Sequence, residues 1–121
     1  MTYSQTSGLF TMGDHTFTGY SGNGDGLNNA EMQDVKGVGP IPQGRYTIGA
    51  PHADAAVGPV AMRLTPAAGN EMFGRSDFLI HGDNYKMDHS ASDGCIVLPH
   101  GARVEIGAAM LAGEDQLSVT A

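Results

Sequence analysis

The sequence has little cysteine and little positive charge. Cys95 is the single cysteine among 121 residues, so no internal disulfide can form. Six Lys and Arg residues stand against 13 Asp and Glu residues, giving a net charge of −7, which argues against nucleic acid or an anionic membrane as a partner. No apolar run is long enough to span a membrane. The N-terminal MTYSQTSGLF lacks the basic start and apolar core of a Sec signal, so we expect synthesis in the cytoplasm and any export by a signal-free route.

Glycine and proline are plentiful, with 18 and six residues, and they are spread singly along the chain. This distribution indicates turns between short strands instead of disorder. Polar and apolar residues alternate between these turns, which predicts about seven short strands. The strands are drawn from eight candidate stretches, residues 2–5, 9–12, 16–20, 44–48, 60–65, 78–81, 95–98 and 116–120, the last as a closing edge strand. A chain of this length has room for one modest core, so we expect a single, mainly β domain over residues 1–121.

One C-terminal helix and one long connection complete the expected architecture. Pro99 opens the helix, and Gly113 ends it. Val104, Ala108 and Leu111 recur at i, i+4 and i+7 and form an apolar stripe, which we expect to pack on the sheet. Residues 22–39 form a connection with only a brief helical turn near residues 30–34. Connections of this length are usually functional or mobile, so we expect it to form one wall of a substrate cleft.

The candidate chemistry lies in residues 78–99, which read FLIHGDNYKMDHSASDGCIVLP. His81 ends an apolar run, and Cys95 ends a polar SDGC turn. A cysteine attacks carbonyl carbon as the thiolate, and His is the usual proton acceptor because its pKa of about 6.5 lies near working pH. A single cysteine can also be a small buried hydrophobe. The polar, glycine-containing turn favours Cys95 as nucleophile and His81 as base.

The residues before the cysteine are expected to support it. Gly94 lets the backbone turn so that its N–H, with those of Asp93 and Cys95, can point at a developing oxyanion. Ser92 is expected to brace the turn through a side-chain hydrogen bond. The Asp93 carboxylate would oppose thiolate formation unless its side chain points away, which a tight turn allows.

The residues after the base have a similar supporting role. The carbonyl of Gly82 is expected to orient the imidazole of His81; Asp83 could orient it instead, although an Asp in such a turn more often closes the turn itself. Arginine can clamp a substrate carboxylate with its forked donors, and tyrosine can line a cleft. The candidate substrate-binding residues are Arg75, Arg63, Tyr20 and Tyr85, for each of which surface or packing roles are the alternative.

Metal binding is considered and disfavoured. His, Cys and carboxylate groups all ligate zinc, but the available residues are not at the spacing of a zinc motif; they are His81, Asp83, His89, Cys95 and His100. The GNGDG segment offers oxygen donors at Asn23, Asp25 and Asn28 but lacks the spacing and the terminal Glu of an EF-hand. We therefore expect neither a metal nor an organic cofactor.

The pattern HG, a loop, then SxGC and an apolar residue resembles the signature of the L,D-transpeptidases, bacterial enzymes that act on peptidoglycan stem peptides. His81, Ser92, Gly94 and Cys95 match that signature. Asp93 stands where the family has a second His, and Val97 stands where Asn or Arg is common. With these two departures, the pattern resembles instead that of a divergent branch, the small effectors delivered by type VI secretion systems. Further segments agree with that branch: YSQTSGL at 3–9, GYSG at 19–22, GPIPQGRYTI at 39–48 and FGRSDF at 73–78.

The resemblance implies a Cys95 thioester enzyme that acts on tetrapeptide stems. Such an enzyme cleaves the bond between the L-centre of diaminopimelate and D-Ala, as an L,D-carboxypeptidase, or exchanges the terminal D-amino acid. It implies an antibacterial toxin delivered into the periplasm of a target cell, and a cognate immunity protein in the producer. The alternatives are a sortase-like cysteine transpeptidase, which normally has an Arg shortly after the cysteine, and a non-enzymatic glycan-binding or structural β module.

Overall fold

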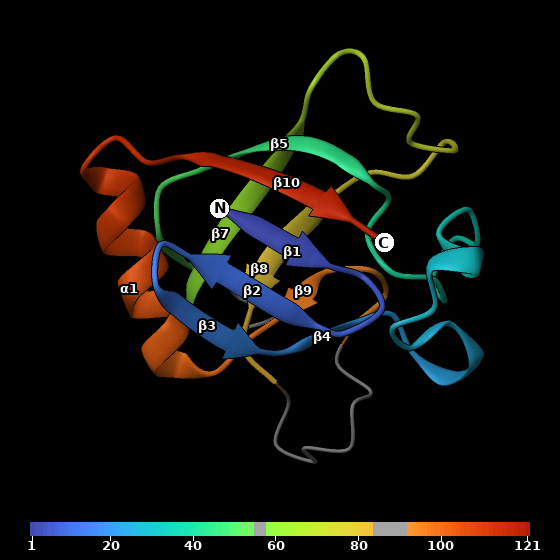
Figure 1. The fold of residues 1–121 in the computed structure, drawn as a ribbon, viewed down its shortest axis with the longest axis horizontal. Coiled ribbons are helices and arrows are strands. Elements are labelled where there is room, and N and C mark those ends of the chain that lie inside the picture. The colour runs from blue at the N-terminus through green and yellow to red at the C-terminus, as the bar shows by residue number, and fades with distance from the viewer. Residues whose placement is uncertain (55–57, 84–91) are drawn as a thin grey trace.

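A computed structural model describes residues 1–54, 58–83 and 92–121 and has a mainly β fold with one α-helix, α1 (His100–Leu111) (Figure 1). The predicted fold class is confirmed. Ten strands occur in the described residues: β1 (Thr2–Ser4), β2 (Leu9–Met12), β3 (His15–Thr18), β4 (Tyr20–Ser21), β5 (Gly44–Ile48), β6 (His52–Asp54), β7 (Gly58–Pro66), β8 (Phe78–His81), β9 (Ile96–Val97) and β10 (Gln116–Thr120). The count exceeds the expected seven partly because β4 and β6 are too short for alternation to reveal them.

The strands form a sheet that nearly closes on itself. They pair in the order β3-β2-β1-β10-β5-β7-β8-β9-β4, and β6 pairs with β7. β3 and β4 stand at opposite ends of this order, yet Gly19 alone separates them in the chain. The sheet must therefore curl until its two ends approach each other. Its interior is filled by fully buried side chains such as those of Tyr3, Phe10, Ile48 and Ile80.

Gly19 marks the point where the ends of the sheet meet. Its N–H donates to the carbonyl of Gly8 at 2.8 Å. A Cβ at this position would lie 2.1 Å from the carbonyl oxygen of Val97. The single strand expected over residues 16–20 is thus interrupted at Gly19, because the backbone passes there directly over the end of β9.

β10 occupies a different place from the one expected. The sequence predicted a closing edge strand, but β10 lies between β1 and β5. It pairs in parallel with β1, with Thr2 opposite Ser118, and antiparallel with β5. The edge prediction was wrong because the N-terminal strands β1, β2 and β3 continue the sheet beyond β10, a long-range pairing that no local pattern indicates.

Helix α1 also packs differently from the prediction. Val104 and Leu111, two members of the expected stripe, are 49% and 71% exposed, and Ala108 is exposed as well. The buried positions are instead Ala102, Arg103, Ile106 and Gly107. A Cβ on Gly107 would lie 2.7 Å from Pro51 Cγ, just before β6, and 3.8 Å from Met62 Sδ in β7, so the absence of a side chain lets the helix approach this part of the fold closely.

The arrangement separates two regions of the molecule. Figure 1 places α1 on one side and the connection between β4 and β5, with its 3₁₀ turns η1 (Gly24–Gly26) and η2 (Ala30–Met32), on the other. The strands β8 and β9 lie between them in the sheet. No helix in the described part of the chain has the length and apolar character needed to cross a membrane.

Gly19→Ala is expected to lower the free energy of unfolding by about 2–3 kcal/mol, because the new methyl group would overlap the Val97 carbonyl. Gly101→Ala is the matched control, since a Cβ there has no neighbour within 4 Å and Ala favours the helix. Urea unfolding followed by circular dichroism measures both variants. Equal stability of Gly19→Ala and the unchanged protein would contradict the close approach.

Candidate functional site

The two candidate catalytic residues come from neighbouring parallel strands. β8 pairs in parallel with β9, with Ile80 opposite Ile96 and His81 opposite Val97. Side chains alternate between the two faces of a strand, and Ile80 and Ile96 both point into the core with no exposed surface. His81 therefore lies on the other face, and continuing the alternation one residue before β9 places Cys95 on that face too.

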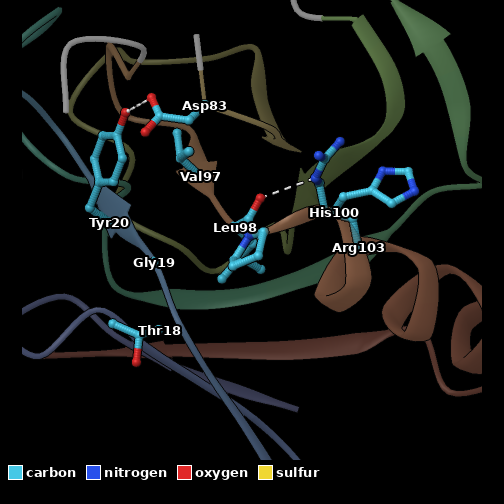
Figure 2. Close-up of a pocket in the computed structure, with 9 residues that line it drawn as sticks. Thr18, Gly19, Tyr20, Asp83, Val97, Leu98, His100 and Arg103 are labelled. Carbon is cyan, nitrogen blue, oxygen red and sulfur yellow. Dashed lines mark hydrogen bonds between the residues drawn. The ribbon is translucent and has the colours of Figure 1, made fainter. Parts of the chain in front are cut away.

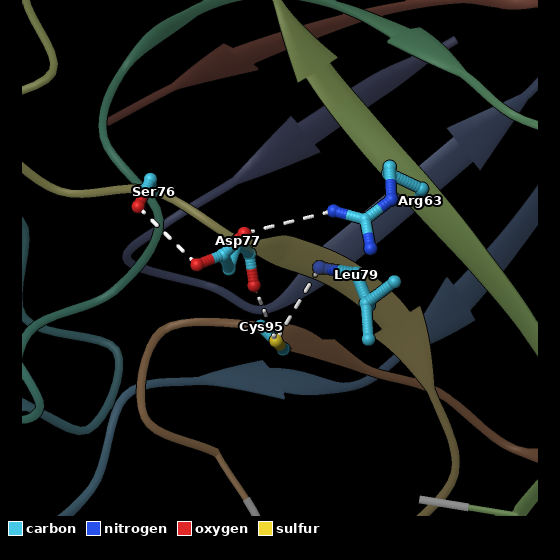
Figure 3. A network of polar contacts seen from close by, with 5 residues as sticks. All are labelled: Arg63, Ser76, Asp77, Leu79 and Cys95. Carbon is cyan, nitrogen blue, oxygen red and sulfur yellow. Dashed lines mark hydrogen bonds and ion pairs between the residues drawn. The ribbon is translucent and has the colours of Figure 1, made fainter. Parts of the chain in front are cut away.

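The sulfur of Cys95 is held against the backbone of β8. Its Sγ accepts a hydrogen bond from the N–H of Leu79 at 3.3 Å and lies 3.9 Å from the carbonyl oxygen of Asp77 (Figure 3). Cys95 is partly exposed. A peptide N–H directed at the sulfur stabilises the thiolate relative to the thiol, and partial exposure leaves the sulfur accessible.

The imidazole of His81 is oriented by the residue that follows it. Its Nδ1 lies 2.7 Å from the carbonyl oxygen of Gly82, and the side chain is 2% exposed. A carbonyl oxygen can only accept a hydrogen bond, so Nδ1 carries the proton in this contact. The lone pair of the neutral ring is then on Nε2, which is the atom able to take a proton.

Ser92 holds the turn that presents the cysteine. Its Oγ accepts hydrogen bonds from the N–H groups of Gly22 at 2.9 Å and Gly94 at 3.0 Å, and it donates to the carbonyl of Cys95 at 2.6 Å. The side chain has no exposed surface. The Gly94 N–H, one of the three donors expected to face an oxyanion, is therefore already bonded to Ser92.

Ser21 and Asn23 add a second layer of support that the sequence did not indicate. Ser21 Oγ donates to the carbonyl of Gly94 at 2.8 Å and accepts from the N–H of Ile41. Asn23 Nδ2 donates to the carbonyl of Ser92 at 2.7 Å. The available signal was the GYSG segment at 19–22, which contributes to the resemblance but does not reveal these partners.

Arg75 is occupied by the protein's own backbone. Its Nη1 donates to the carbonyls of Gln33 and Pro40, and its Nη2 donates to those of Gly39 and Asp93, at 2.6–3.1 Å. The side chain is 5% exposed, and burial lowers the pKa of its guanidinium. Through these contacts Arg75 ties the β4–β5 connection to the cysteine turn; the substrate clamp considered from the sequence stays a prediction.

The remaining candidates lie around this core of the site. Tyr20 donates its hydroxyl to Asp83 at 2.6 Å, while the carbonyl of Gly82 contacts the His81 ring. Arg63 is largely exposed and lies 3.7 Å from the Asp77 carboxylate, beside Cys95 (Figure 3). The Asp93 side chain is exposed. Tyr85 and His89 lie outside the described residues.

A cavity of about 240 Å³ adjoins the cysteine turn. Its lining comes from the β4–β5 connection (Lys36, Gly37), from the segment that enters β8 (Ser76, Asp77, Phe78) and from Asp93. The long connection thus forms part of a cavity wall next to the turn. Within residues 1–54, 58–83 and 92–121, no three His, Cys, Asp or Glu residues gather closely enough to hold a metal ion.

A family model described as the Tlde1 domain matches residues 15–121. The chain belongs to the Tlde1 domain family. This family consists of L,D-transpeptidase-like effectors of type VI secretion, which agrees at the family level with the resemblance seen in the HG and SxGC motifs. No curated protein matches the chain.

Ser92→Ala is expected to lower the free energy of unfolding by about 2–4 kcal/mol, because two buried N–H groups lose their acceptor. We also expect slower alkylation of Cys95, since the turn that presents the thiol loses its brace. Ser76→Ala is the matched control: Ser76 is exposed and makes one long contact, 3.4 Å, to Asp77. Denaturant titration and iodoacetamide labelling measure the two effects, and identical values for both variants would count against the brace.

Proposed function

We propose that the protein is a cysteine L,D-carboxypeptidase that cleaves the bond between diaminopimelate and D-Ala in peptidoglycan tetrapeptide stems. The observation that supports it best is the parallel pairing of β8 and β9 described above. It combines a sulfur that accepts the Leu79 N–H with a His81 ring whose Nδ1 is fixed by Gly82. Membership of the Tlde1 domain family directs this chemistry to peptidoglycan and favours it over the sortase-like and non-enzymatic alternatives.

The reaction begins with transfer of the Cys95 thiol proton to Nε2 of His81. The thiolate attacks the carbonyl carbon at the L-centre of diaminopimelate, and the N–H groups of Asp93 and Cys95 stabilise the oxyanion. The C–N bond then breaks, and protonated His81 returns the proton to the amine of D-Ala. Water attacks the thioester, which releases the tripeptide acid and regenerates the thiol. A free D-amino acid in place of water gives exchange of the terminal residue.

The 240 Å³ cavity beside the cysteine turn is the proposed entry for the stem peptide. Arg63 is exposed near Cys95 and forms a long ion pair with Asp77, so it is the proposed ligand for a carboxylate of the donor stem. Tyr20 lies near the other end of β9, where its pairing with Val97 places it close to the His81 side of the site. The protein needs no metal for this chemistry.

Cys95→Ala is expected to abolish conversion of tetrapeptides to tripeptides, with a loss of at least about 10³-fold, because no other group can form the thioester. His81→Gln is expected to cost about 10²–10⁴-fold through loss of the base. His15→Gln is the matched control, since His15 is exposed and contacts Glu105. Mass spectrometry of muropeptides measures the products. Reactions with and without D-methionine distinguish exchange from hydrolysis, and a reaction with a chelator is the control for metal dependence. Full activity in Cys95→Ala would contradict the proposed function.

We further propose that the protein is a toxin acting in the periplasm of a target bacterium and that the producer carries an inhibitor of it. Export of the unchanged protein to the periplasm of a susceptible cell is expected to cause lysis or loss of viability. Cys95→Ala exported to the same level is the control and should be harmless, because the wall damage requires the nucleophile. Equal survival with both proteins would contradict the toxin proposal.

A further inference from the structure

A second and larger cavity, of about 390 Å³, lies at the opposite end of β8 and β9 from the cysteine turn. Its walls come from residues 18–20, from Asp83 and from residues 97–100, and Arg103 of α1 closes it (Figure 2). In Figure 2 the Tyr20–Asp83 pair stands on one side, and His100 and Arg103 stand on the other. The cavity therefore adjoins the end of β8 that carries the proposed base.

Arg103 is a buried cation for which the described residues supply no counter-charge. It is 8% exposed, and none of the ion pairs in the described residues includes it. Its Nε donates to Leu98 O at 3.1 Å, and its Nη1 donates to Pro59 O at 2.8 Å and Val60 O at 3.2 Å. Nη2 has no acceptor in the part of the chain that the structure describes. Burial of a guanidinium is costly unless charge and donors are satisfied.

Comparison with Arg75 shows that this arrangement differs from a purely structural arginine. Both residues are buried, but Arg75 uses both of its Nη atoms for backbone carbonyls, two for each atom. Arg103 uses its Nε and one Nη atom to fix the guanidinium, and its second Nη atom stays available beside the cavity. A donor that is fixed in this way is suited to an anion in the cavity.

Arg103 Nη2 lies close to the residue that follows the proposed base, His81. A Cβ on Gly82 would lie 2.6 Å from Arg103 Nη2, so the guanidinium packs against the residue that directly follows His81. The N-terminus of α1 contributes to the same wall through Pro99 and His100, and no side chain caps it. The positive end of the helix dipole therefore adds to the attraction for an anion.

We propose that Arg103 Nη2 binds the α-carboxylate of the amino acid that leaves or enters during the reaction at Cys95. This inference rests on the proposed function. His81 exchanges its proton with the α-amine of that amino acid, and the α-carboxylate is attached to the same carbon atom. A fixed cation next to Gly82 is thus placed to select substrates that end in a free carboxylate.

The first test compares two ligands, with and without a carboxylate, in a protein that keeps Arg103. ¹⁵N NMR titration of Cys95→Ala with D-alanine is expected to shift the signals of Gly82 and Arg103 Nε. D-alaninamide, which lacks the carboxylate, is expected to bind at least about ten-fold more weakly, because a charge-assisted hydrogen bond is lost. Arg103→Gln should remove the preference for the acid, and Arg103→Lys should restore part of it. Arg45→Gln, an exposed arginine in β5, should leave the preference unchanged.

The leaving residue is tested with the unchanged enzyme. The KM for tetrapeptide stems ending in D-Ala amide is expected to be at least about ten-fold higher than the KM for stems ending in the free acid. Cleavage of both stems with equal KM, together with equal binding of acid and amide, would overturn the carboxylate site and leave the proposed function standing. Preference for the acid in Cys95→Ala without cleavage of any stem would support the site and overturn the proposed function. If Arg103→Gln fails to fold, the acid and amide comparison still decides.

Discussion

The parallel pairing of β8 with β9 is the constraint on which the site depends. It sets His81 opposite Val97 and Ile80 opposite Ile96, so that Cys95, one residue before β9, shares a face with His81 although a connection separates them in sequence. The turn before Cys95 is fixed by Arg75, whose four carbonyl contacts join the β4–β5 connection to Asp93. Hydrogen bonds from a charged donor are among the stronger ones in proteins, and here they join the turn at Asp93 to the β4–β5 connection.

The candidate catalytic residues could be proposed from the sequence because their signals are local. A histidine followed by glycine at a strand end, and a cysteine preceded by glycine in a polar turn, stand out in the sequence alone. The role of Gly82 as the acceptor for the imidazole follows from the same short segment. The structural contacts of Arg75 could not be predicted, because its acceptors are backbone carbonyls of residues 33–40 and 93, and a carbonyl carries no sequence signature.

The fold could also be predicted only as far as local sequence signals reach. The fold class and most strands follow from alternation and from the glycine and proline positions, whereas the place of β10 depends on pairing between the two ends of the chain. For α1, the apolar positions Val104 and Leu111 indicated a face that is in fact exposed. Close packing on the sheet favours small residues, and Arg103 is buried because it reaches backbone carbonyls, so hydrophobicity alone selected the wrong side of the helix.

The position of β10 has a consequence for the order in which the molecule can assemble. β1 is the first strand along the domain, and its parallel partner β10 is the last. Pairing of β1 with the rest of the sheet therefore waits until every other element of the domain has been synthesised, since β10 lies between β1 and β5. The sheet becomes continuous from β3 to β9 only when β10 inserts between two strands that precede it in the chain.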